Sequence, residues 1–395
     1  MIDPKDIIRR YSPEELAETA DEYYRRIDDP TPLMTKPFSF LHETPEMLQN
    51  LGALLAGLSL GKTMTVLDFG GGTGWLTRFL TQLNCQVICC DVSRAALAIG
   101  KRLMTELPLL GTAVYQPVFL PFDCHRIELP TASVDRVICF DAFHHVPNQR
   151  EVLSEFSRVL RDGGIAGFSE PGRQHSRSPQ SQYEMANHRV LENDIDLADI
   201  WTIARDCGFT RLTTKLINDM SLSLDDYARI YDGRAKDDLR NEIWNETHNT
   251  MFNRAVFFLH KGPLRRDSRS HVGLAHVLQV RCHTPQVSEG QPIKLTISAT
   301  NTGDATWLHE NSEIFGTVRI GAHLYAVDGT LLAIDHSRHA LPVSVAPGQS
   351  VVVEIEERLP GVGRFRLGFD VVAEGVTWFE TTGSQPVFVD VVATR

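Results

Sequence analysis

Short apolar runs alternate with helical patterns along the chain from about residue 63 to residue 260. Residues 64–69, 86–90 and 134–140 are apolar, strand-like runs, and a pattern with helical spacing begins at Trp75. Strands that alternate with helices in this way predict βαβ units and a parallel sheet. We therefore expect an α/β domain in this part of the chain.

The pattern changes near residue 262. Beyond a polar, basic segment, the chain contains short strand-like runs separated by turns of Gly, Asn, Asp and Pro, which are typical of a β-sandwich. The stretch ahead of the α/β domain has helical patterns instead. We predict a helical N-terminal lid over 1–62, an α/β domain over 63–261, a linker over 262–275 and a β-sandwich over 276–395.

Composition and net charge indicate which kind of protein this is and which partners are disfavoured. The 395 residues, 42% hydrophobic and 23% charged, suit a globular protein of two or three domains. A net charge of −11 disfavours nucleic acid and anionic membranes as partners. Without a signal-like N-terminus or a long apolar run, we expect a cytoplasmic protein that does not insert into membranes. The seven cysteines lack C-x-x-C spacing, which favours buried reduced thiols over a metal site.

The strongest chemical signal is a glycine-rich turn directly after the first predicted strand. A G-x-G-x-G motif covers residues 70–74 and follows Asp68. Such a turn lets backbone N–H groups approach an anionic or nucleotide-like ligand. The dinucleotide fingerprint needs a small residue where this chain has Trp75, so NAD is the weaker choice. Asp91 ends the second predicted strand, where a carboxylate can accept hydrogen bonds from both hydroxyls of a ribose.

In these features, roughly residues 40–260 resemble the class I S-adenosylmethionine-dependent methyltransferases. Residues 122–124 and the fourth predicted strand, continuing through 141–146, agree with this resemblance. It implies a seven-stranded Rossmann-like domain that binds S-adenosylmethionine, with Asp123 at the adenine amino group and Cys124 beside the ring. The residues expected to bind the cofactor are Asp68, Gly70, Gly71, Gly72, Gly74, Asp91, Val92, Asp123, Cys124 and Asp141.

Methyl transfer requires alignment of the acceptor and, for a hydroxyl group, removal of its proton. Open α/β sheets bind ligands at the C-terminal ends of their strands, and His144 and His145 follow the fourth predicted strand. Adjacent residues at a helix start do not face the same way, so one histidine should pack or cap while the other faces the site. The resemblance implies that Asp141 shapes the cofactor pocket rather than acting as the base.

A long polar segment, residues 170–185, follows the fifth predicted strand, and the resemblance places the acceptor site there. It offers a base with an orienting carboxylate and two guanidinium groups suited to a phosphate or carboxylate. A solvated loop whose arginines pair with nearby acids is the alternative. The candidates are Glu170 and His175 for the base pair, Arg173 and Arg177 for an anion, and Tyr183 and Glu184 for the acceptor.

The C-terminal part carries no nucleophile or metal-ligand cluster at a persuasive spacing. Its turn sequences, such as residues 301–307 and 361–367, resemble Ig-like sandwiches and more specifically the polysaccharide-binding domain of O-antigen ABC transporters. This resemblance implies a binding or scaffolding module. The rings of Trp307, Trp378 and Phe379 would stack on sugars if they are exposed, and packing in the core is the alternative.

Two classes of function remain open at this point. The first is a methyltransferase that O-methylates a sugar of a bacterial surface polysaccharide or its activated precursor. Its enzyme alternative is a small-molecule O-, N- or C-methyltransferase whose sandwich serves dimerisation. The second class is an interaction protein with a non-catalytic Rossmann-like half, against which the intact set of glycines and acids argues. The aromatic and basic N-terminal segment, including Tyr23 and Tyr24, suits a lid over the cofactor or an ordinary capping helix.

Overall fold

The computed structural model describes residues 1–111, 113–217, 220–311 and 314–395. These residues form two compact units, the first made of Met1–Leu60 with Met64–Leu264 and the second of Gly61–Thr63 with Arg265–Arg395. The predicted linker over 262–275 needs correction, because strand β8 (Arg266–Asp267) pairs with β12 (Ala305–Thr306) inside the second unit. Backbone pairing therefore gives regular structure to a segment whose polar sequence suggested a bare connection.

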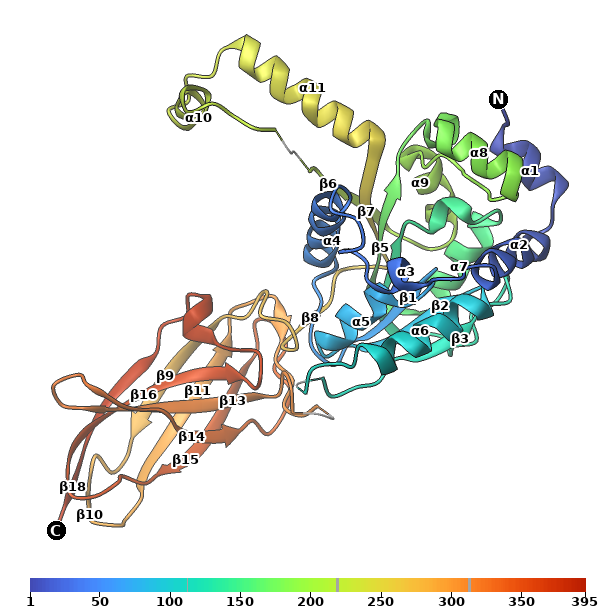
Figure 1. The fold of residues 1–395 in the computed structure, drawn as a ribbon. Helices are drawn as coiled ribbons and strands as arrows, with labels where there is room; N and C mark the ends of the chain where they lie inside the picture. The colour runs from blue at the N-terminus through green and yellow to red at the C-terminus, as the bar shows by residue number, and fades with distance from the viewer. Residues whose placement is uncertain (112, 218–219, 312–313) are drawn as a thin grey trace. The chain divides into compact units, whose positions relative to one another are not determined.

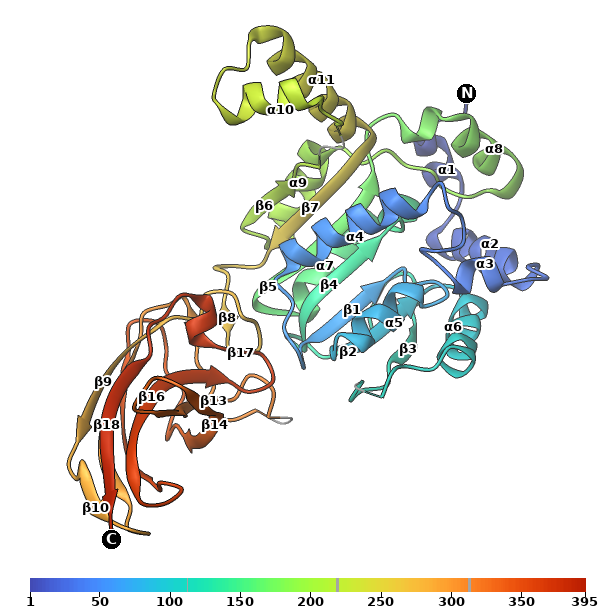
Figure 2. The same cartoon turned by 60° about the vertical axis from the view of Figure 1, so that its left-hand side comes forward.

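The first unit is built on a seven-stranded sheet with the order β3-β2-β1-β4-β5-β7-β6 (Figures 1 and 2). Strand β7 runs antiparallel to both of its neighbours, whereas the other neighbouring strands are parallel. This mixed sheet confirms the predicted Rossmann-like fold. Its strands are β1 (Thr65–Phe69), β2 (Gln86–Asp91), β3 (Val118–Pro121), β4 (Val134–Phe140), β5 (Leu160–Pro171), β6 (Arg211–Lys215) and β7 (Arg254–His260).

Apolar cores form on both faces of this sheet, because alternate residues of each central strand point to opposite sides. Val66 packs with helices α4 and α5, while Leu67 packs with α7 and α9. Figure 2 shows α4 lying across β5 and β7. The helices are α1 (Pro4–Arg10), α2 (Pro13–Arg25), α3 (Thr31–Met34), α4 (Thr44–Leu58), α5 (Trp75–Gln82), α6 (Arg94–Glu106), α7 (Gln149–Val159), α8 (Pro179–His188), α9 (Leu197–Asp206), α10 (Leu224–Tyr231) and α11 (Asp237–Asn253).

Across the described ranges, none of these helices combines the length and apolar character needed to cross a bilayer. Cys85, Cys89, Cys90, Cys124 and Cys139 are buried and form no disulfide in the described parts of the chain, and most of them lie within or beside the strands of the sheet.

Two glycines of α4 give a matched test of how closely this helix approaches the sheet. A Cβ at Gly57 would lie 2.0 Å from the ring of Phe258 on β7, whereas a Cβ at Gly52 would meet nothing within 4 Å. We expect Gly57→Ala to lower the free energy of unfolding by about 1–3 kcal/mol through overpacking. Gly52→Ala should raise it by up to about 1 kcal/mol, because alanine is the better helix former.

Urea unfolding of both variants, followed through the transition of the first unit, measures this difference. Equal stability of the two variants would contradict the close packing of α4 on β7.

The second unit contains two sheets that share one apolar core, in the order β10-β18-β16-β13-β14, with β17 paired to β16, and β15-β11-β9. Trp307 and Phe379 are completely buried in that core, which rules out stacking of these two rings on a sugar. Trp378 is only half-buried. The remaining strands are β9 (His276–Cys282), β10 (Gln286–Ser288), β11 (Ile293–Asn301), β13 (Val318–Ala326), β14 (Leu331–Ala340), β15 (Ser350–Glu357), β16 (Gly363–Ala373), β17 (Thr377–Trp378) and β18 (Val387–Thr394).

Candidate functional site

The glycine motif forms the turn between β1 and α5. Gly70, Gly72 and Gly74 have φ angles of +67°, +53° and +73°, a region that favours glycine because it has no Cβ. At Gly70 a Cβ would also come 2.3 Å from the Cβ of Ala142, and at Gly71 it would come 2.7 Å from the Sγ of Cys89. The turn therefore requires these glycines, and its backbone is held within the protein, because Gly70 and Gly71 donate to the carbonyl oxygen of Cys90 and Gly74 donates to that of Gly71.

Asp91 holds this turn in place and faces the adjacent cavity. Its two carboxylate oxygens accept hydrogen bonds from the backbone N–H groups of Gly72 and Ser93, both at 2.8 Å. Burial raises the pKa of Asp91 to about 6, against the effect of these two hydrogen bonds. Each oxygen keeps a lone pair for a further donor. Asp91 and the neighbouring Val92 both line the cavity.

Asp68 supports the turn from behind. It is buried, does not line the cavity, and accepts a hydrogen bond from the Thr77 hydroxyl of α5. Burial raises its pKa to about 7. The structure therefore places Asp68, one of the predicted cofactor ligands, in a position that ties β1 to α5.

The cavity has a volume of about 450 Å³ and lies beside the glycine turn. Helix α2 forms one wall through residues that include Leu16, Tyr23 and Tyr24. Asp21 of the same helix fixes this wall by accepting hydrogen bonds from the Ser93 hydroxyl at 2.9 Å and from the Ala95 N–H at 2.8 Å, at the start of α6. The N-terminal segment thus covers the glycine turn.

The residues after β3 contribute unequally to the cavity. Phe122 and Cys124 line it, but Asp123 is exposed and lies outside the lining. One carboxylate oxygen of Asp123 accepts the backbone N–H groups of His125 at 2.9 Å and Arg126 at 2.7 Å. In this structure Asp123 therefore stabilises its own turn.

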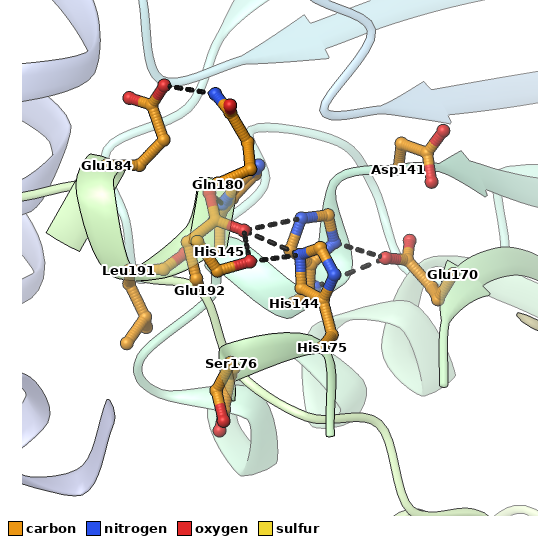
Figure 3. Close-up of polar contacts among 12 residues, drawn as sticks. Asp141, His144, His145, Glu170, His175, Ser176, Gln180, Glu184, Leu191 and Glu192 are labelled. Atoms are coloured by element: carbon orange, nitrogen blue, oxygen red, sulfur yellow. Dashed lines mark hydrogen bonds and ion pairs between the residues drawn. The ribbon is translucent and has the colours of Figure 1, made fainter. Parts of the chain in front are cut away.

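Glu170, at the end of β5, organises the segment that follows β4. Its fully buried carboxylate accepts the N–H groups of Phe143 at 2.9 Å and Ala142 at 3.1 Å, and it contacts His144 Nδ1 at 2.7 Å (Figure 3). Burial alone would lower the pKa of His144, but the hydrogen bond to Glu170 outweighs it and raises that pKa. Glu170 is therefore the partner of His144 and not of His175, which corrects the predicted base pair.

The partner of His175 is Glu192, a residue that the sequence analysis did not single out. Glu192 Oε2 lies 2.6 Å from His175 Nε2 and 3.9 Å from His144 Nε2, and Oε1 lies 3.8 Å from His145 Nδ1 (Figure 3). Burial would raise the pKa of Glu192, yet the hydrogen bond from His175 and the neighbouring histidines lower it. An ionised carboxylate thus sits among three imidazoles.

His145 is the histidine that faces the cavity, with 40% of its side chain exposed, while His144 is buried. Its Nδ1 lies 2.6 Å from the carbonyl oxygen of Leu191, so Nδ1 carries the proton and the lone pair of the neutral ring is on Nε2. Desolvation by the surrounding protein and the nearby His144 lower the pKa of His145 to about 4. His145 is therefore neutral at pH 7 and able to accept a proton. This division of roles agrees with the expectation that one of the two histidines packs and the other faces the site.

Asp141 also faces the cavity, at a φ of +50° between β4 and His144. Its carboxylate lies 2.6 Å from the guanidinium of Arg254 on β7. Burial opposes ionisation of Asp141, but Arg254 outweighs it and holds the pKa below its usual value. An ion-paired Asp141 is a poor base, which suits the predicted role in shaping the pocket.

The predicted acceptor residues after β5 separate in the structure. Glu184 of α8 lines the cavity. Arg173 instead lies 2.8 Å from Asp196 and lines a second hollow together with Arg177, and the exposed Tyr183 packs its ring near His188. Arg173 thus follows the alternative expectation of an arginine paired with a nearby acid.

Residues 67–168 match a family model described as a methyltransferase domain. Similar curated proteins include the ubiquinone/menaquinone biosynthesis C-methyltransferases UbiE of Coxiella burnetii strain Dugway 5J108-111 and Pseudomonas savastanoi pv. phaseolicola. The first is 29% identical over 113 residues, which are 27% of this chain and 43% of that protein. The second is 28% identical over 138 residues, which are 33% of this chain and 52% of that protein. The chain thus spans about half the length of the curated relatives it matches.

Similar solved structures include a chain of the complex between the Haloferax volcanii Trm112 methyltransferase activator and a putative methyltransferase. That chain is 17% identical with a TM-score of 0.43, over 64% of this chain and all of that one. Another is Haemonchus contortus phosphoethanolamine N-methyltransferase 2 in complex with S-adenosyl-L-methionine, 18% identical with a TM-score of 0.40, over 67% of this chain and 60% of that one. The family match therefore identifies residues 67–168 of the first unit as a methyltransferase domain.

Proposed function

We propose that the protein transfers a methyl group from S-adenosylmethionine to an acceptor held in the cavity under α2. One observation carries this proposal. The same cavity is lined by Gly70 and Asp91 and also by His145 and Glu192. A cofactor-binding turn and a neutral imidazole therefore open onto the same space, as group transfer between two bound molecules requires.

The residues around the turn fit the cofactor. Gly70 lines the cavity, and its positive φ angle and lack of a Cβ fit a turn that a bulkier residue would disrupt. The lone pairs that remain on Asp91 suit the two ribose hydroxyls. Phe122 and Cys124 offer an apolar surface suited to the adenine ring. When bound, the cofactor supplies a methyl group already activated by its sulfonium.

The chain's own part in the reaction is to align the acceptor and to take its proton. His145 accepts the proton at Nε2, because Nδ1 is committed to the carbonyl of Leu191. The ionised Glu192 stabilises the imidazolium that results, at a distance of 3.8 Å. Glu170 fixes the backbone that carries both histidines and acts as a positioning residue.

For the acceptor we propose a sugar hydroxyl of a bacterial surface polysaccharide or of its activated precursor. Apolar side chains of α2 and the ring of Tyr23 line the cavity together with the polar side chains of Gln180 and Glu184. This mixed lining suits a molecule with one apolar and one hydroxyl-bearing face. The second unit would then hold the polymer, with the half-buried Trp378 as the remaining aromatic candidate. A small-molecule acceptor methylated at carbon is the second candidate, which the similarity to the UbiE C-methyltransferases favours.

Calorimetric titration of the full chain with S-adenosylmethionine tests the first step. Asp91→Asn removes a charge-assisted acceptor worth about 1.5–3 kcal/mol, so cofactor affinity should fall roughly 10- to 100-fold. Asp123→Asn is the matched control and should leave affinity near the wild-type value, because Asp123 lies outside the cavity. Absence of cofactor binding to the wild-type protein would overturn the proposed function.

Isotope-labelled cofactor then identifies the acceptor class. We expect label in nucleotide-linked or lipid-linked sugars, on oxygen by product NMR. Label on the carbon of a quinone precursor instead would favour the second candidate.

A further inference from the structure

A buried histidine and two carboxylates meet at one edge of the second unit. His323 lies on β13, Asp370 on β16, and Glu380 in the short helix η3 (Phe379–Thr382). Each offers one ligand atom, and these atoms all lie within 4.8 Å of one another. His323 and Asp370 are 1% and 0% exposed, whereas 37% of the Glu380 side chain is exposed.

The buried ring of His323 has a lone pair without a partner. Its Nδ1 contacts the carbonyl oxygen of Ile334, so Nδ1 carries the proton and Nε2 of the neutral ring has a free lone pair. Among the described residues, Nε2 has no hydrogen-bond partner, and it lies 3.8 Å from Glu380 Oε1. A buried acceptor that faces further acceptors is unfavourable unless something positive lies between them.

Hydrogen bonds hold the buried carboxylate of Asp370 in place. Its Oδ1 contacts His276 Nε2 and accepts the Val371 N–H at 2.7 Å. Its Oδ2 accepts the Glu380 N–H at 2.9 Å and keeps a lone pair. Histidines held by a carbonyl and carboxylates held by hydrogen bonds are the usual surroundings of metal ligands.

We propose that His323, Asp370 and Glu380 bind a divalent transition-metal ion such as Zn²⁺. One imidazole nitrogen and two carboxylate oxygens form a donor set that suits this class of ion, with bonds of about 2.0–2.2 Å. The exposed Glu380 is the ligand able to swing inward and provides the route of entry. The ion would join β13, β16 and η3 and would give the lone pair of His323 Nε2 a positive partner.

Co²⁺ titration of the chelator-stripped full chain tests this proposal through two signals. The absorption spectrum should show d–d bands without thiolate charge-transfer bands, which excludes the cysteines as ligands. The ring of Trp378 lies 4.1 Å from that of His323, so bound Co²⁺ should quench Trp378 fluorescence. Trp378→Phe should remove the quenching while the d–d bands persist.

Ligand substitutions then locate the ion. Glu380→Gln should weaken Zn²⁺ binding by at least about tenfold, the smaller end of losses seen even for outer-shell partners. His323→Gln should abolish it. His339→Gln is the matched control, because His339 pairs with Glu357 elsewhere in the same unit and should bind Zn²⁺ like the wild type. No binding by the wild-type chain, or binding unaffected by Glu380→Gln, would overturn the proposal, and the exposed Glu380 keeps the test valid if His323→Gln fails to fold.

Discussion

Replacing His145 with glutamine is expected to lower kcat by about 10²- to 10⁴-fold, the usual contribution of a general base. Glutamine keeps a side chain of similar polarity but cannot accept the acceptor's proton. Affinity for S-adenosylmethionine should change little, because the substitution leaves the glycine turn and Asp91 unaltered. Single-turnover methyl transfer with saturating cofactor measures the effect, and His248→Gln, on the exposed surface of α11, is the control.

The rate of methyl transfer is expected to fall only at low pH. A base must be unprotonated, and the pKa of His145 is lowered to about 4. Activity should therefore stay level as pH falls from 8 to 6 and decline only as pH approaches the lowered pKa of His145. A decline centred near the ordinary histidine pKa of about 6.5 would assign the base to a different group.

Replacing Glu170 with glutamine is expected to give the largest loss of stability, about 3–5 kcal/mol. The buried carboxylate accepts backbone N–H groups and holds His144, and an amide leaves an N–H group facing those donors. Urea unfolding measures the loss. Glu151→Gln is the matched control, because its contact with His125 at 3.1 Å is exposed and contributes only about 0–1 kcal/mol.

The contact between Glu170 and His144 also predicts that the stability losses of the two substitutions are not additive. Once His144 is glutamine, the further change Glu170→Gln should cost less, since the two groups interact directly, with a coupling of about 0.5–3 kcal/mol. Strict additivity in this double-mutant cycle would mean that Glu170 acts only through the backbone.

The first unit was predictable where chemistry is local. The glycine turn needs positive φ angles at fixed spacing, and apolar runs buried on both faces of a sheet leave a continuous trace in the sequence. The contact between Glu170 and the segment after β4 could also be predicted from the sequence. Phe140 and Ser169 pair across β4 and β5, so the residues that follow them leave the sheet at the same edge.

The rest of the site depends on tertiary folding. Glu192 lies in an irregular segment after α8, and no periodicity or motif connects it to His175 or His145. In the second unit, His323 stands 47 residues before Asp370 in the printed sequence, and only the antiparallel pairing of β13 with β16 brings their side chains together. Sequence spacing therefore identified the residues of single turns but not those assembled from separate elements.

The walls of the cavity come from two different parts of the chain. The segment shared with other methyltransferases, 67–168, supplies the glycine turn, Asp91 and His145, whereas α2 and the residues from Arg189 to Glu192 lie outside it. Homologues that keep segment 67–168 can therefore differ in the residues that contact the acceptor. Homologues that exchange only these outer walls should keep the same methyl donor and methylate different compounds.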